Sequence, residues 1–138
     1  MFGQRLIGFI LAASVSIFFA VGAVTAAGPA LTPQSSSYGG VTISVAPKGF
    51  SSDGKTWDFD ITLETHTQSL GDELTKSSAL LADGKSYLPL DWEGAPAGGH
   101  HRKGILRFQA ISPPPDAVEL QIQRSGEPSA RSFRWQLK

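Results

Sequence analysis

The segment that most constrains the fold is a run of ten residues, Trp57 to His66, in which two kinds of side chain alternate. One face carries Trp57, Phe59, Ile61, Leu63 and Thr65. The other face carries Asp58, Asp60, Thr62, Glu64 and His66. Because successive side chains of a β-strand point to opposite sides, this period of two predicts a strand with one face on a core. The other face is expected to meet solvent or a partner.

Shorter runs with the same alternation occur before and after this segment. Their apolar positions are Val41, Ile43 and Val45; Leu106, Phe108 and Ala110; Val118, Leu120 and Ile122; and Phe133, Trp135 and Leu137. Two more apolar runs, 78–82 and 86–90, are joined by Asp83-Gly84, a dipeptide suited to a tight hairpin turn. Pro89 cannot donate to a strand ladder, so the second of these runs is expected at a sheet edge, or to end there.

These runs predict about seven short strands separated by turns, and residues 68–76 predict a crossing loop with one helical turn. The fold class is therefore all-β, an antiparallel immunoglobulin-like β-sandwich over residues 41–138. A chain of this size buries roughly two thirds of its unfolded surface, which is enough for one core. The large members of that core are expected to be Trp57, Phe59, Phe108, Phe133 and Trp135.

The N-terminal segment, residues 1–27, has the layout of a secretory signal peptide. Arg5 precedes the apolar run 6–24, and Val24-Thr25-Ala26 fits the three positions before a cleavage site. The alternative is an uncleaved membrane-anchoring helix over residues 6–27, since that length would reach roughly 33 Å against roughly 30 Å of hydrocarbon core. In both cases Arg5 stays on the cytoplasmic side, so the rest of the chain is expected to be periplasmic or secreted.

Residues 28–40 read GPALTPQSSSYGG and have no apolar period. We therefore expect a flexible linker between the N-terminal segment and the sandwich.

Composition excludes several classes of function. Lys and Arg number 12, as do Asp and Glu, so the chain lacks the basic character of a nucleic-acid binder. It contains no cysteine, which rules out disulfides, Cys-ligated zinc, iron–sulfur clusters and thiol catalysis. The sequence contains no G-x-S-x-G motif, and three histidines alone give no catalytic triad, so we expect no enzyme.

The segment from Asp91 to Gly104 concentrates glycines and holds the adjacent His100 and His101. With His66, these histidines are candidate ligands for Cu²⁺ or Zn²⁺. Adjacent side chains of an extended segment point to opposite faces, however, and no H-x-H or H-E-x-x-H spacing completes a site. The metal site is therefore the less favoured interpretation, and no cofactor is expected under the favoured one.

The favoured interpretation of this segment is structural: a glycine-shaped connection between the sheets. One histidine would then pack on Trp92 or bond to the backbone, while Arg102 would pair with Glu93. Arg102 and Lys103 would face water. The residues expected to shape this loop are Asp91, Trp92, Glu93, Gly98, Gly99 and Arg102.

The run D-W-E-G…G-G-H-H-R-K-G-I-L-R-F, from Asp91 to Phe108, and the closing F-R-W-Q-L resemble small exported bacterial proteins of uncharacterised function. Their pattern is W-x-G…GGHHR-x-G-x-L-x-F. This resemblance implies an envelope or secreted location and an immunoglobulin-like sandwich. It implies no activity and transfers no role to any residue.

Taken together, the sequence predicts an exported, non-catalytic β-sandwich that acts as a binding or assembly module for a protein or envelope partner. The exposed strand edges beside Pro89 and the turn at 112–116 are the expected places for a partner strand. The alternative is an envelope protein that binds Cu or Zn. Contact with a membrane is expected only through the N-terminal segment, if it is uncleaved.

Overall fold

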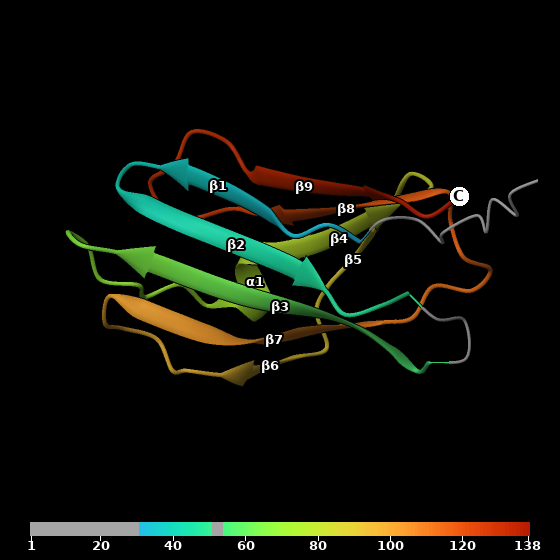
Figure 1. Ribbon diagram of the computed structural model, residues 1–138, viewed down its shortest axis with the longest axis horizontal. Helices are drawn as coiled ribbons and strands as arrows, with labels where there is room; N and C mark the ends of the chain where they lie inside the picture. Colours follow the sequence, from blue (N-terminus) through green and yellow to red (C-terminus); the bar gives the residue numbers. More distant parts are fainter. Residues whose placement is uncertain (1–30, 51–53) are drawn as a thin grey trace, which may run out of the picture.

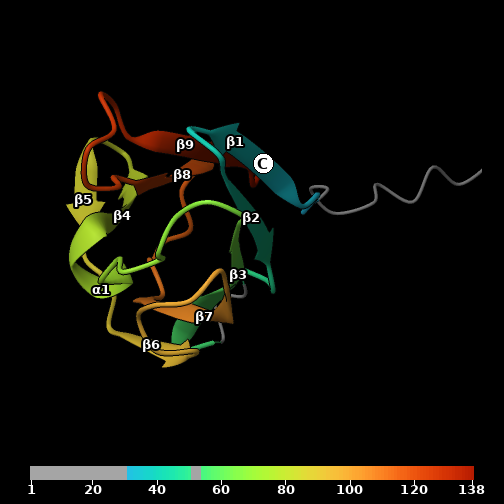
Figure 2. The ribbon, with the colours of Figure 1, turned by 90° about the vertical axis from the view of Figure 1, so that its left-hand side faces the viewer.

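The computed structural model describes residues 31–50 and 54–138, and the part described is all-β (Figure 1). In chain order its elements are β1 (Gln34–Tyr38), β2 (Val41–Pro47), β3 (Thr56–Thr65), α1 (Leu74–Ser77), β4 (Ser78–Ala82), β5 (Lys85–Tyr87), β6 (Asp91–Gly94), β7 (His101–Gln109), β8 (Ala117–Ile122) and β9 (Arg131–Gln136). A five-stranded sheet has the order β1-β2-β3-β7-β6, and a four-stranded sheet has the order β5-β4-β8-β9. Figure 2 shows the two sheets as two layers.

The predicted antiparallel β-sandwich is confirmed, with nine strands in the described residues where the sequence predicted about seven. The two additional strands are β1 and β6, which lie in segments without an apolar alternation of their own. That the sandwich is immunoglobulin-like stays a prediction. The predicted signal peptide or anchor helix, residues 1–27, lies outside the described residues.

The strand β3 is the centre of the five-stranded sheet, as its long alternation predicted. It pairs with β2 on one side and with β7 on the other, and its odd-numbered residues are buried. Phe59 contacts both Phe108 of β7 and Trp135 of β9, with ring centroids 5.7 Å apart in each pair. The five large side chains expected in the core are all buried there: Trp57, Phe59, Phe108, Phe133 and Trp135.

The linker predicted over residues 28–40 is wrong from residue 34 onward, because β1 begins there and pairs with β2. Two hydroxyl pairs join these strands, Ser35 to Ser44 at 2.9 Å and Ser37 to Thr42 at 2.7 Å between the oxygens. The folded part therefore begins before residue 41. The serine-rich segment becomes a strand because its partner supplies the pairing, which an apolar pattern within the segment cannot reveal.

The chain passes between the sheets after β3, after β5 and after β7. The first passage contains α1, the single helical turn expected within residues 68–76, and Figure 2 shows α1 at the side of the sandwich between β4 and β6. Among the described residues, no helix is long and apolar enough to cross a membrane.

The hairpin of β4 and β5 follows its sequence signal. Asp83 and Gly84 both adopt positive φ, 51° and 74°, as a two-residue hairpin turn requires. The strand β5 ends at Tyr87, two residues before Pro89, and it lies at the edge of its sheet. This confirms the expected edge strand.

Candidate functional site

The segment from Asp91 to Gly104 is a hairpin within one sheet and not a connection between the two sheets. Residues Asp91 to Gly94 form β6, which pairs with β7, so the first four residues of the predicted loop are a strand. Gly94 lies directly opposite Gly104. A Cβ built on Gly94 would lie 2.4 Å from the Gly104 Cα, closer than real contacts permit. Gly94 and Gly104 are therefore needed because the two backbones approach each other closely beneath the Trp92 ring.

Arg102 is buried, with 3% of its surface exposed, and does not face water as expected. Its guanidinium donates to the carbonyl oxygens of Leu70 at 3.2 Å and Asp72 at 2.7 Å. It also donates to the Ala95 carbonyl, through Nε at 3.4 Å and Nη2 at 3.3 Å. Arg102 thus fastens the passage between β3 and β4 to the β6–β7 hairpin. Burial lowers the pKa of Arg102 from its ordinary value, while the nearby charge of Asp72 opposes that shift.

The expected pair between Glu93 and Arg102 does not form. Glu93 and Asp91 both pair with Arg107, which also lies 3.6 Å from the Asp58 carboxylate. The register explains the error: Glu93 and Arg107 share the outer face of the sheet, while Arg102 belongs to the inner face. The side chain that packs on Trp92 is therefore Arg102 rather than a histidine, with its Cζ 5.6 Å from the ring centroid.

Gly98 and Gly99 shape the turn before β7, as expected. Both have positive φ, 113° and 72°, which residues other than glycine rarely adopt. This path lets the Gly98 N–H donate to the Leu70 carbonyl at 2.7 Å and the Leu70 N–H donate to the Gly99 carbonyl at 3.0 Å. The glycine pair thus holds the same passage that Arg102 fastens.

The three histidines, His66, His100 and His101, are all exposed. His101 Nδ1 lies 3.2 Å from Glu64 Oε1, across the β3–β7 pair. The His100 carbonyl accepts a hydrogen bond from the Thr65 N–H at 2.9 Å, so the segment carrying His66 runs close to His100. Within residues 31–50 and 54–138, however, no three His, Asp or Glu side chains are grouped so that they could hold a metal ion.

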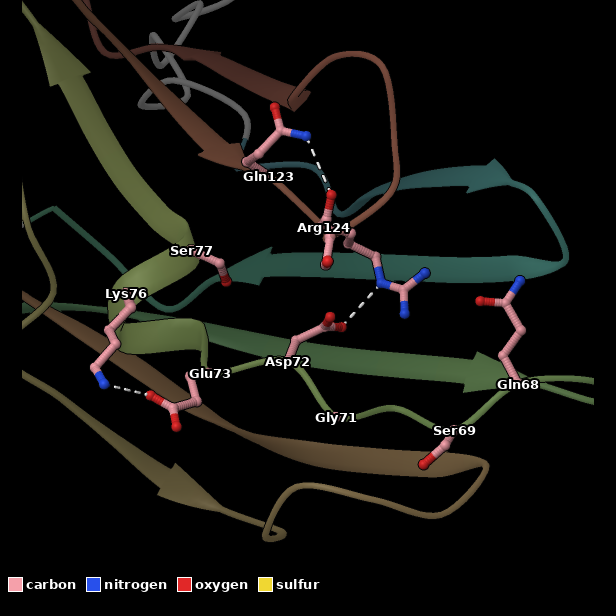
Figure 3. Close-up of a pocket in the computed structure, with 10 residues that line it drawn as sticks. Gln68, Ser69, Gly71, Asp72, Glu73, Lys76, Ser77, Gln123 and Arg124 are labelled. Carbon is pink, nitrogen blue, oxygen red and sulfur yellow. Dashed lines mark hydrogen bonds and ion pairs between the residues drawn. The ribbon is translucent and has the colours of Figure 1, made fainter.

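An open cleft lies beside the passage between β3 and β4. None of the candidate site residues identified in the sequence lines it. Its volume is about 860 Å³ (Figure 3). The lining residues are Gln68, Ser69, Gly71, Asp72, Glu73, Lys76, Ser77, Gln123, Arg124 and Ser125. Apart from Gly71, every lining side chain is polar or charged. The Glu73–Lys76 pair lies at one end in Figure 3 and Gln68 at the other, with Asp72 and Arg124 between them.

A charge network underlies this cleft. Arg124 Nε donates to Asp72 at 2.9 Å, and Arg124 Nη1 lies 3.4 Å from Glu127. Arg131 bonds to the same Glu127 at 2.7 Å, and also to the Val41 carbonyl in the β1–β2 hairpin at 2.9 Å. The hydrogen bond from Arg131 is the largest cause that lowers the pKa of Glu127 below its ordinary value of 4.5, and burial partly opposes it.

One sequence signal reveals this network. The inward positions of β8 are Val118, Leu120 and Ile122, and Arg124 continues their period of two. Arg131 likewise precedes the inward Phe133 and Trp135. An arginine at an inward position must find partners within the protein, because burying an unpaired charge is costly.

The two sides of the sandwich differ in how their strand edges are finished. Where β1 lies beside β9, the Gln34 amide donates to the Arg134 carbonyl at 2.6 Å and accepts from the Arg134 N–H at 3.3 Å. On the other side, β5 is followed by Leu88 and Leu90, which are 70% and 58% exposed. The first edge is bridged by a side chain that acts as a strand partner would, while the second presents apolar side chains to solvent.

Among solved structures, the chain is similar to MPT63, a secreted protein from Mycobacterium tuberculosis, at 16% identity and a TM-score of 0.45. The alignment covers 76% of this chain and 92% of that chain. No protein-family model and no curated protein matches the sequence. A structural likeness this distant assigns no residue a role.

Proposed function

We propose that this protein is an exported, non-catalytic β-sandwich that binds an envelope protein partner along the β5 side. The observation that carries the proposal is the pair of exposed leucines, Leu88 and Leu90, beside the edge strand β5. Exposed apolar side chains beside an open edge suit an extended partner segment, whose backbone pairs with the strand while its apolar side chains cover the leucines.

Export is supported by the sequence of residues 1–27, whose cation, apolar run and small-residue end are those of a signal peptide. Amino-terminal sequencing of the exported protein tests this part. A mature chain that begins after Ala26 is expected. A chain that still begins at Met1 would replace the signal peptide with a membrane anchor.

The absence of catalysis is supported by how the charged side chains of the cleft are used. Asp72 is paired with Arg124, and Glu73 with Lys76, so neither carboxylate stands unpaired beside a nucleophile. A general base must lie within hydrogen-bond reach of the group it deprotonates. Within the described part of the chain we find no such pair of base and nucleophile to nominate.

Site-specific photo-crosslinking tests the partner surface. A photoreactive amino acid at position 88 of the exported protein is expected to capture a partner in intact cells, and Leu90→Glu in the same chain is expected to abolish the capture. The matched control places the photoreactive group at Tyr38, which is 53% exposed in the β1–β2 hairpin, away from β5.

Two outcomes would overturn the partner surface. Equal capture from positions 88 and 38 would mean that exposure alone, and not the β5 edge, determines contact. A product with twice the mass of the chain would mean that the β5 edge pairs with a second copy rather than with another protein.

A further inference from the structure

Each charged side chain that lines the polar cleft already has a partner in the protein. Arg124 bonds to Asp72 at 2.9 Å, and Lys76 Nζ lies 2.8 Å from Glu73 Oε2. Anion sites usually present free cations or backbone N–H groups to the ligand. A phosphate or carboxylate entering this cleft would have to compete with existing ion pairs.

The same side chains are not saturated by these pairs, although only 8% of the Asp72 side chain and 7% of the Arg124 side chain are exposed. A guanidinium has five N–H donors and a carboxylate about four acceptor sites, and each internal pair uses only a part of them. Ser77 Oγ is buried in the wall and forms no hydrogen bond with the described residues. Since a ligand in the cleft does not reach this buried atom, the hydroxyls available to it are those of the exposed Ser69 and Ser125.

The volume and the walls of the cleft limit the class of ligand that it can bind. Its volume of about 860 Å³ lies within the range of roughly 300–1,000 Å³ typical of small-molecule sites. The wall contains no apolar side chain, which disfavours an apolar ligand. Loops and α1 form the walls, not an open strand edge, so an extended peptide would find no ladder to join.

We propose that this cleft binds an uncharged, hydroxyl-rich ligand, a neutral oligosaccharide, through Asp72, Arg124 and the serines at its rim. Hydroxyl groups both donate and accept, so they match a wall that offers donors and acceptors without net charge. This site is separate from the leucines beside β5, and the two proposals stand or fall independently.

Calorimetric titration of the exported chain tests the proposal. Maltotriose, cellotriose and triacetylchitotriose are the neutral probes, and inorganic phosphate and sialyllactose are the anionic ones. We expect saturable binding of at least one neutral trisaccharide and weaker or no binding of the anions. Ser69→Trp and Ser125→Trp, which fill the cleft from opposite walls at exposed positions, are expected to weaken that binding at least tenfold.

Ser129→Trp is the matched control, because Ser129 is an exposed serine outside the cleft lining, and it is expected to leave binding unchanged. Thermal melts show whether each variant is folded, and Ser69→Ala serves as a milder variant if a tryptophan disturbs the fold. The proposal is overturned if none of the three trisaccharides binds, if binding survives both tryptophans, or if an anion binds more tightly.

Discussion

Gly94 and Gly104 face each other in β6 and β7 so closely that neither position has space for a side chain. A Cβ on Gly94 would lie 2.4 Å from the Gly104 Cα, and a Cβ on Gly104 would lie 2.6 Å from the Trp92 ring. Trp92 is held over this contact by the bond from its Nε1 to the Ala95 carbonyl, 3.0 Å long. These glycines are therefore required by packing and not by a turn.

Replacing Gly104 with alanine is expected to lower the free energy of unfolding by about 1–3 kcal/mol, the usual cost of adding a methyl group to a filled site. Urea denaturation measures this cost. Gly71→Ala is the control, because a Cβ there would have no atom within 4 Å. Equal stabilities of the two variants would contradict the close approach.

Arg102→Met is expected to lower the free energy of unfolding by about 1–3 kcal/mol, because the half-buried Asp72 carbonyl loses its donor, while the Leu70 and Ala95 carbonyls each keep one other donor. Arg134→Met is the control, since Arg134 is exposed and its hydrogen bonds with the described residues involve only its backbone groups. Hydrogen exchange adds a local readout. Protection of the Leu70 and Gly98 amides is expected to fall in Arg102→Met alone. Unchanged protection would argue that Arg102 does not hold this passage to the β6–β7 hairpin.

The half-buried Glu127 predicts how the stability of the protein depends on pH. Because Arg131 lowers its pKa in the folded protein, the stability that Glu127 contributes is present above its ordinary pKa of 4.5. That contribution is lost as the pH falls below 4.5 and through the folded-state pKa. Glu127→Gln is therefore expected to be less stable at neutral pH and to lose less stability on acidification.

Urea melts of the two chains across this range measure the difference. Glu119→Gln, at a half-buried position that does not share the Arg131 network, is the control and is expected to follow the unsubstituted chain. Parallel curves for Glu127→Gln and the unsubstituted chain would contradict the role assigned to Glu127.

Deleting residues 131–138 is expected to prevent folding. The deletion removes β9 with Phe133 and Trp135, which are 1% and 3% exposed. Loss of a buried aromatic costs about 3–5 kcal/mol, and total stabilities are about 5–15 kcal/mol. Deleting only the terminal Lys138 is the control and is expected to be tolerated. A cooperative melt of the larger deletion near that of the full chain would show that β9 is dispensable.

Titration with Cu²⁺ and Zn²⁺ is expected to show no stoichiometric uptake at micromolar metal, because within residues 31–50 and 54–138 no three His, Asp or Glu side chains are grouped so that they could hold a metal ion. His66→Ala, His100→Ala and His101→Ala accompany the titration. Uptake that disappears in two of these three variants would restore the metal-binding interpretation.

The fold was predictable wherever a strand carries its own apolar period. The alternation from Trp57 to His66 placed the central strand and its buried face. By contrast, β1 and β6 are strands because a neighbouring strand pairs with them, and residues such as Ser35 or Glu93 carry no signal of that pairing. Local pattern therefore identified the core strands and missed those at the edge of the five-stranded sheet.

The site was harder to predict for a different reason. Histidines attract notice because of their chemistry, yet in the described structure they are exposed and form no ligand group. Arg102, Arg124 and Arg131 are the buried charged residues that organise this end of the molecule. Their inward register was visible in the sequence. Their partners, such as the Leu70 carbonyl, come from segments distant along the chain and could not be predicted from periodicity.

The buried arginines join segments that are distant along the chain. In many small exported domains, disulfides join such segments. Arg131, for example, joins β9 to the β1–β2 hairpin through carbonyls on residues 36, 38 and 41. Since the chain has no cysteine, its assembly needs neither an oxidant nor a disulfide isomerase. The protein is therefore expected to mature at the same rate in reducing and oxidising surroundings, and a thiol reductant should leave its melting temperature unchanged.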